Sequence, residues 1–249
     1  MGLYLNFDRV LTPKELDELR ELVKRRGQRE PLQQILGTTS FCGFEMALDA
    51  NVLVPRPETE LLAEAGWEYL NSLHGSAEPP LALDFGTGSG CLAIAVAIKS
   101  PVAKLVAVDI SPKALAIARQ NAAVHRVDSR IEFFEGNGFS ALPSGSRFEL
   151  ILSNPPYIPS AEIATLEPEV RDHDPRTALD GGEDGLDFYR RLAREAGAFL
   201  KPGGRIMLEF GDGQADALRN LFEREKWIVE AVKPDYSGRS RMLIASRAD

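Results

Sequence analysis

Long apolar runs and cysteine-rich patterns are both missing from this sequence of 249 residues. No apolar run approaches the roughly 18 residues that a membrane-spanning helix needs, and the N-terminus lacks a charged segment followed by an apolar one. The two cysteines, Cys42 and Cys91, lie far apart in the sequence and form neither a metal-binding motif nor a disulfide framework. We therefore expect a cytoplasmic protein with no membrane partner and no metal site.

Basic residues are also scarce. The chain has 29 Lys and Arg against 37 Asp and Glu, which gives a formal net charge of −8. A protein that binds nucleic acid through its phosphates normally carries a basic stripe. The densest basic cluster, Lys24-Arg25-Arg26, lies near the N-terminus, where it could instead meet an acidic protein surface. Direct binding to nucleic acid is therefore not expected.

Histidine-based chemistry is not indicated. The sequence has three histidines, His74, His125 and His173, and none has sequence neighbours that suggest a catalytic triad or a metal site. We interpret each as a surface or helix-end residue.

Segments with strand and helix patterns alternate through most of the chain. This alternation predicts an α/β fold with a parallel, doubly wound sheet. With 44% hydrophobic residues, the chain can bury one sizeable core. Strands are expected near residues 81–85, 104–109, 131–135, 148–153, 204–210, 227–233 and 241–246, and helices near 58–73, 91–98, 114–123, 185–200 and 214–225.

The N-terminal region predicts a small appendage to this domain. Thr12 and Glu15 have the spacing of a capping box, and leucines at 16, 19 and 22 indicate an amphipathic helix. Residues 35–53 contain two glycines and alternating apolar positions, most simply a β-hairpin that connects this helix to the main domain.

The run Asn154-Pro155-Pro156-Tyr157 directly follows the expected strand 148–153. The prolines fix φ and donate no N–H, so the carbonyls of Asn154 and Pro155 stay free to accept hydrogen bonds. Asn154 adds a side-chain oxygen, and Tyr157 adds a flat aromatic face. Such a rim suits a planar group that carries N–H, for example an amide or an exocyclic amine.

A glycine turn, Gly86-Thr87-Gly88-Ser89-Gly90, follows the first expected strand. The spacing departs from the G-x-G-x-x-G of dinucleotide-binding proteins, so a pyrophosphate ligand is not favoured. Asp84 ends the strand and could pair with an ammonium group. Asp109 follows the first glycine by 109 − 86 = 23 residues, close to the roughly 20 expected of an acid that binds ribose, although a solvated strand-end acid is the alternative. S-adenosylmethionine has the shape that these groups fit.

These motifs resemble the class I S-adenosylmethionine-dependent methyltransferases and, among them, the bacterial glutamine methyltransferases of peptide chain release factors. Seven stretches look like that family's patterns in the family's order, and they cover nearly all of the chain from Arg29 onward. They are residues 30–37, 41–43, 54–60, 154–157, 178–186, 208–211 and 235–239.

The resemblance implies a mostly parallel seven-stranded sheet that ends in an antiparallel hairpin. It also implies an N-terminal helical segment over residues 1–34, a hairpin linker over 35–55 and a cofactor-binding catalytic domain over 56–249. The activity would be methyl transfer from S-adenosylmethionine, with S-adenosylhomocysteine as product, to the side-chain amide of a glutamine in class I release factors. The enzyme is expected to be a monomer.

The resemblance also implies the roles of individual residues. Asn154, Pro155 and Tyr157 would act on the glutamine amide. Substrate contacts are expected from Asn154, Pro155, Pro156, Tyr157, Arg56 and Glu58, and cofactor contacts from Asp84, Gly86, Thr87, Gly88, Gly90, Asp109, Ile110, Asn137, Gly138 and Asn154.

Two departures from the family's pattern stand out. Asn137-Gly138 replaces an acidic residue followed by tryptophan; Asn137 can still donate and accept hydrogen bonds to adenine, but a covered adenine face is not expected. Only about 28 residues precede the linker region, where the family has a multi-helix domain. Either the sequence is truncated or the helical domain is reduced.

Alternatives stay open for several features. Arg56 and Glu58 could contact substrate or simply begin a helix, where Glu favours the helix dipole. Glu209 could be a pocket residue or a strand-end acid. The acidic stretch between Asn154 and Asp184 is interpreted as a substrate-facing loop, with a plain solvated loop as the alternative.

Two other functions compete with glutamine methylation. The first is methylation of adenine or another exocyclic amine in nucleic acid, which the run 154–157 would serve equally well, but the acidity of the chain opposes it. The second is a non-catalytic nucleotide-binding or dehydrogenase module, which the glycine spacing disfavours.

Overall fold

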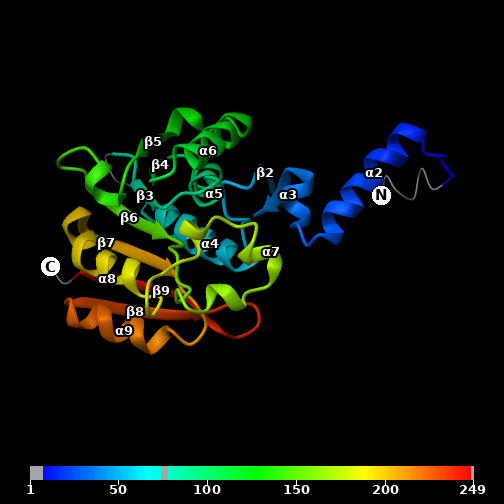
Figure 1. The fold of residues 1–249 in the computed structure, drawn as a ribbon. Coiled ribbons are helices and arrows are strands. Elements are labelled where there is room, and N and C mark those ends of the chain that lie inside the picture. Colours follow the sequence, from blue (N-terminus) through cyan, green and yellow to red (C-terminus); the bar gives the residue numbers. More distant parts are fainter. Residues whose placement is uncertain (1–7, 74–77, 248–249) are drawn as a thin grey trace.

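The computed structural model describes residues 8–73 and 78–247 of the chain (Figure 1). His74, one of the histidines considered above, lies outside the described residues.

The main body is built on one seven-stranded sheet with the strand order β5-β4-β3-β6-β7-β9-β8 (Figure 1). β9 pairs antiparallel with both β7 and β8, and the other neighbouring strands of this sheet pair in parallel. The predicted mostly parallel sheet with a closing antiparallel hairpin is therefore confirmed. The central strands are apolar and buried on both faces, as parallel strands between helices must be. The strands are β3 (Leu81–Phe85), β4 (Lys104–Asp109), β5 (Ile131–Glu135), β6 (Phe148–Ser153), β7 (Leu200–Glu209), β8 (Trp227–Pro234) and β9 (Ser240–Arg247).

Helices cover both faces of the sheet, and the sheet separates the core into two layers (Figure 1). One layer packs α4 (Pro57–Ser72), α5 (Cys91–Lys99) and α6 (Pro112–Val124) on the sheet. The other packs α8 (Asp187–Glu195) and α9 (Ala215–Arg224). Short 3-10 turns complete the main body at η1 (Asp128–Arg130), η2 (Gly138–Ala141) and η5 (Ala196–Phe199).

The N-terminal appendage begins with α2 (Pro13–Gly27), which stands away from the main body (Figure 1). Its predicted capping box is formed by Thr12 and Glu15, but none of its residues is buried. The predicted hairpin is present and shorter than residues 35–53, with strands β1 (Thr38–Phe41) and β2 (Phe44–Ala47). The pattern at its start was misinterpreted, because Leu32–Leu36 forms the helix α3.

The stretch between β6 and α8 is folded back on itself and is not an irregular loop. It contains η3 (Ile163–Thr165), α7 (Pro168–Arg171) and η4 (Arg176–Ala178), and a bridge pairs Ile158 with Asp180. We call residues 158–184 the rim segment.

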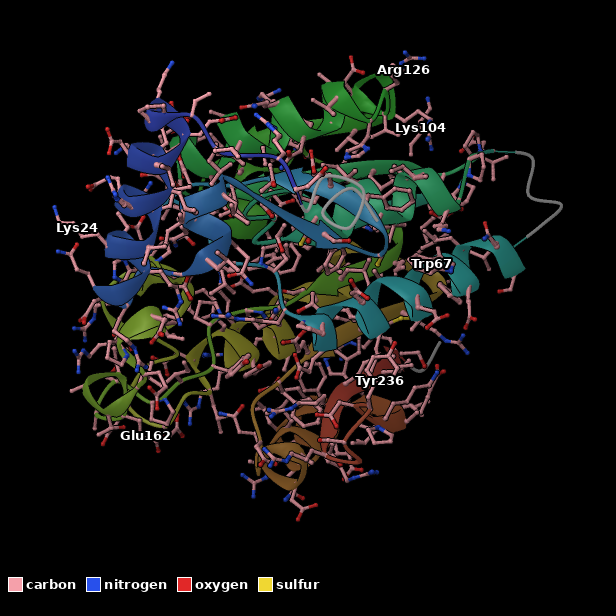
Figure 2. The ribbon with its side chains drawn as sticks, turned by 90° about the vertical axis from the view of Figure 1, so that its right-hand side faces the viewer. Lys24, Trp67, Lys104, Arg126, Glu162 and Tyr236 are labelled. Atoms are coloured by element: carbon pink, nitrogen blue, oxygen red, sulfur yellow. The ribbon has the colours of Figure 1, made fainter. Side chains whose placement is uncertain are left out.

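The rim segment also contacts the appendage. Arg26 and Arg29, at and just beyond the end of α2, form ion pairs with Glu169 and Glu167. In Figure 2, Lys24 on α2 and Glu162 on the rim segment lie along the same edge of the molecule. Of the basic cluster Lys24-Arg25-Arg26, Arg26 therefore meets an acidic side chain of the rim segment.

No helix among the described residues is long and apolar enough to cross a membrane. Nor do residues 8–73 and 78–247 gather three or more His, Cys, Asp or Glu side chains in an arrangement that could hold a metal ion.

Candidate active site at the carboxyl edge of the sheet

A cavity of about 560 Å³ opens at the carboxyl ends of strands β3, β4, β5 and β6. Ligands of open α/β sheets bind at this edge, because the loops that leave the strands there diverge. The cavity is also bordered by residues 51–53 and Pro55, which lead into α4, and by residues 175–178 of the rim segment.

The glycine turn after β3 forms the floor of this cavity. Gly86 and Gly88 both line it and have positive φ values of 77° and 55°. A Cβ added to either glycine would meet no heavy atom within 4 Å, so both face open space into which a ligand can approach. Gly90 does not line the cavity; its Cβ would lie 3.0 Å from the side chain of Ala118, so it serves helix packing.

Asp84 lies beneath the turn and is completely buried. Its Oδ2 accepts hydrogen bonds from the Thr87 hydroxyl at 2.7 Å and from the Ala93 N–H at 3.1 Å. Its Oδ1 has no hydrogen-bond partner among the described residues. Burial raises the pKa of Asp84 to about 6, and the nearby Asp109 adds to this, against the two hydrogen bonds. Asp84 therefore holds the glycine turn in place through Thr87, which lines the cavity.

Asp109, at the end of β4, lines the cavity. Oδ2 accepts from the N–H of Gly88 and Oδ1 from the N–H of Ser111, both at 2.9 Å. Each carboxylate oxygen has a second lone pair, so both can still accept from a ligand hydroxyl. Ile110 follows, lines the cavity and is 61% exposed, which leaves an apolar surface for a ligand.

Asn137 and Gly138 form the next part of the wall, after β5. The guanidinium of Arg191 donates to both the Oδ1 and the backbone oxygen of Asn137, which holds this residue at the rim. Gly138 has φ of 64°, and a Cβ there would lie 2.5 Å from the ring of Phe85. The ring of Phe85 therefore lies against the position where the family has tryptophan, and Phe85 lines the cavity.

Asn154, directly after β6, is held from below by a chain of hydrogen bonds. Its Nδ2 donates to the Thr59 hydroxyl at 3.0 Å, and this hydroxyl lies 2.6 Å from Oε2 of Glu209. The Oδ1 of Asn154 accepts no hydrogen bond from the described part of the chain, and neither does the carbonyl of Pro155. Asn154 lines the cavity with its Oδ1 unpaired, whereas Pro155 does not line the cavity although its carbonyl is unpaired, as the fixed proline backbone predicted.

Glu209 ends β7 and is only 3% exposed. Burial raises its pKa to about 7, since the hydrogen bond from Thr59 compensates only part of the desolvation. Of the two interpretations left open, Glu209 is a buried strand-end acid that does not itself line the cavity but contacts a residue that does.

The rest of the run 154–157 is packed tightly. Pro155 is buried and Pro156 lines the cavity. The carbonyl of Tyr157 accepts from Nε2 of Gln214 at 3.0 Å. A Cβ on Gly211 would lie only 2.9 Å from the ring of Tyr157. Burial raises the pKa of Tyr157 to about 12, so the phenol stays neutral.

Arg56 and Glu58 lie outside the cavity lining. Arg56 pairs with Asp174 of the rim segment at 2.7 Å, and the side chain of Asp174 is 1% exposed. Burial raises the pKa of Asp174, while Arg56 opposes the shift. Glu58 lies in the first turn of α4. The pair with Asp174 joins the start of α4 to the rim segment, which favours the structural interpretation of Arg56.

Thr59 and Gln214 were missed by the sequence reasoning. Thr59 falls within the stretch 54–60, on the same face of α4 as the buried Leu62, Ala63 and Gly66. A hydroxyl on an otherwise apolar, buried helix face was the available signal, since such a group needs a buried partner. Gln214 carried no comparable signal.

Comparison with known proteins places the chain among methyltransferases. Residues 70–166 match the family described as Methyltransferase small domain, and residues 1–37 match the PrmC N-terminal domain. The release factor glutamine methyltransferase of Geobacter sulfurreducens is 48% identical over 98% of this chain and 82% of its own length. The protein of the same name from Rhodospirillum rubrum is 45% identical over 96% of this chain and 72% of its own length.

A solved structure supports the fold. The 16S rRNA N2 G1207 methyltransferase of Thermus thermophilus, solved with AdoMet and guanosine, superposes with a TM-score of 0.58. It is 19% identical, and the match covers 85% of this chain and 50% of that one. At this identity the likeness concerns the fold alone.

Proposed function

We propose, because the chain belongs to the release factor glutamine methyltransferase family, that it methylates the side-chain amide of the glutamine in the Gly-Gly-Gln loop of class I peptide chain release factors. One observation carries the proposal beyond family membership. Two consecutive residues carry unpaired acceptors: Oδ1 of Asn154, which lines a cavity whose floor leaves room for a second ligand, and the carbonyl of Pro155, the next residue.

The residues of the cavity fit S-adenosylmethionine. Gly86 and Gly88 leave the floor open to a close ligand, and Asp109 offers two carboxylate oxygens to ribose hydroxyls. Ile110 supplies apolar surface, and Asn137 and Gly138 form the wall where the adenine is expected. When bound, this cofactor supplies a methyl group on a sulfonium ion, which becomes a neutral thioether once the methyl has left. Asp84 lies under the glycine turn and holds this turn in shape.

The chain's own task is to present the acceptor nitrogen. An amide nitrogen is a poor nucleophile because its lone pair is delocalised into the carbonyl. With one N–H held by Oδ1 of Asn154 and the other by the carbonyl of Pro155, the lone pair is turned toward the methyl group. Both bonds strengthen as positive charge develops on the nitrogen, which is differential binding of the transition state. The nitrogen then releases one proton to solvent, and the methylated amide remains. Tyr157 does not line the cavity; its neutral ring packs against Gly211 behind the run 154–157.

Recognition outside the pocket falls to the surfaces nearest its mouth. We assign this role to the rim segment and to the appendage that Arg26 and Arg29 join to it. The helical segment 1–34 and the hairpin linker 35–55 then share recognition with the rim segment, which belongs to the cofactor-binding catalytic domain of residues 56–249. A monomeric, cytoplasmic enzyme with no nucleic-acid partner fits this arrangement and the net charge of −8.

A methylation assay with paired substrates tests the proposal. Purified enzyme is incubated with radiolabelled S-adenosylmethionine and either a bacterial class I release factor, the same factor with its loop glutamine replaced by alanine, or total RNA and DNA. Label is expected only in the unaltered release factor. Label in the adenines of nucleic acid, with the release factor unlabelled, would reverse the assignment. Light scattering of the purified chain tests the monomer.

A further inference from the structure

We propose that Thr59 and Glu209 form a positioning relay that fixes which way round the Asn154 amide stands, so that its oxygen and not its NH₂ group faces the acceptor nitrogen. The inference rests on the proposed function, and it adds two residues that act on the acceptor amide only through Asn154.

An asparagine amide can stand in two orientations that differ little in shape. With Oδ1 toward the cavity, Asn154 accepts a hydrogen bond from a substrate N–H. Turned by half a rotation, it would present its own N–H groups, which repel the N–H groups of an amide substrate. The rigid backbone of the prolines does not settle this choice, because it leaves the end of the side chain free to rotate.

The hydrogen bonds beneath Asn154 settle it. An ionised carboxylate only accepts, so the 2.6 Å contact between Thr59 and Glu209 uses the single hydroxyl proton of Thr59. The hydroxyl oxygen can then only accept a hydrogen bond from Asn154, so Asn154 must donate through Nδ2, at 3.0 Å. All three residues have one consistent direction of donation, from Asn154 through Thr59 to Glu209.

The burial of the relay makes this direction costly to break. Thr59 is 2% exposed and Glu209 is 3% exposed, so water cannot replace a lost partner. Because the relay ends on a carboxylate, its direction depends on the ionisation of Glu209. A protonated Glu209 could donate as well as accept, and the orientation of Asn154 would no longer be fixed.

Several charged or titratable groups surround Glu209. Arg56 and Glu58 approach from the start of α4, Arg241 from β9, and Tyr157 from the end of β6. Tyr189 of α8 donates its hydroxyl to the backbone oxygen of Glu209 at 2.8 Å. Burial raises the pKa of Glu209 to about 7, so its proton is exchanged within the range in which an enzyme can be assayed.

The test uses single-turnover methylation of a class I release factor by the full chain. Thr59→Val keeps the shape and removes the hydroxyl; its rate constant is expected to fall roughly tenfold or more, the scale of one lost oriented contact. Thr59→Ser, which restores the hydroxyl, should stay within about threefold of the wild type. The affinity for S-adenosylhomocysteine, measured by calorimetry, should be unchanged in both variants.

A double-mutant cycle separates positioning from general damage. In the Asn154→Ala background, where no amide is left to orient, Thr59→Val should cost less than about twofold more. A full additional tenfold loss there would overturn the relay, as would a Thr59→Val enzyme with wild-type rate or a Thr59→Ser enzyme as slow as Thr59→Val.

A pH profile gives a second, independent readout should Thr59→Val fold poorly. The wild-type rate constant should rise as pH increases through about 7, whereas Glu209→Gln should be slower and flat between pH 6 and 8. Glu132→Gln, on the exposed side of β5, is the matched control and should follow the wild type. A flat wild-type profile would overturn the relay. If the wild type leaves the release factor unmethylated at every pH, the proposed function itself has failed.

Discussion

Replacing Glu209 by Gln should make the protein more stable at alkaline pH while it weakens methyl transfer. The pKa of Glu209 is raised by burial from an ordinary value of 4.5 to about 7. Between these two values the unfolded chain releases the proton and the folded chain retains it. The unfolded state therefore binds fewer protons, and the free energy of unfolding falls as pH rises through this window.

The size of this effect follows from the shift. Each pKa unit corresponds to about 1.4 kcal/mol, so an ionised Glu209 destabilises the fold by on the order of 3 kcal/mol at pH 8. At pH 5 most of this cost is absent, because the side chain is still protonated in the folded state. The difference in stability between Glu209→Gln and the wild type should therefore grow by about 2–3 kcal/mol in favour of the variant from pH 5 to pH 8.

Urea denaturation followed by circular dichroism, at four pH values between 5 and 8, measures this difference. Other titrating groups are common to both proteins and cancel in the comparison. Glu132→Gln, an exposed substitution on β5, controls for the loss of one surface charge. A stability difference that stays constant within about 0.5 kcal/mol over this range would refute the reasoning. Ionisation of Glu209 would then not lower the free energy of unfolding.

Three further outcomes are expected. Asp109→Ala should weaken binding of S-adenosylhomocysteine by about 1.5–3 kcal/mol in calorimetry, with the exposed Asp128→Ala as control, and an unchanged affinity would remove Asp109 from the site. Gly88→Ala, whose Cβ would enter open space, should weaken cofactor binding more than Gly90→Ala does. Gly90→Ala, which would press on Ala118, should lower the melting temperature more than Gly88→Ala does, and the reverse ranking would contradict the cavity geometry. Glu169→Ala, which removes the ion pairs to α2, should speed proteolytic cleavage between α2 and α3 without changing the melting temperature of the main body, and an unchanged cleavage rate would show that the ion pairs do not hold α2.

The central parallel strands were predictable because their signals are local, whereas the closing antiparallel hairpin was expected only from the family resemblance. Strands β3 and β6 are short apolar runs bounded by turn residues, and residues 131–135 and 148–153 were expected where the structure has them. The helix α3 was missed because Leu32–Leu36 is a single turn and a half, too short for a helical period to show. The short helices of the rim segment escaped for the same reason.

The site was predictable where a backbone motif defines it and not where tertiary contacts do. The glycine turn and Asn154 carry their geometry in the local sequence. Gly90 looks like its neighbours in the motif, yet only the fold shows that it packs on Ala118. The partnership of Thr59 with Glu209 joins residues 150 positions apart, and no local pattern reports it.

The most direct test of the account is mass spectrometry of a class I release factor after incubation with this enzyme and S-adenosylmethionine. The account predicts the added mass of one methyl group on the peptide that contains the Gly-Gly-Gln loop, located to the glutamine side chain. It also predicts almost no such peptide with the Asn154→Ala enzyme, which should still bind S-adenosylhomocysteine. An unmodified loop peptide, or a methyl group on any other residue while the wild-type enzyme binds its cofactor, would contradict it.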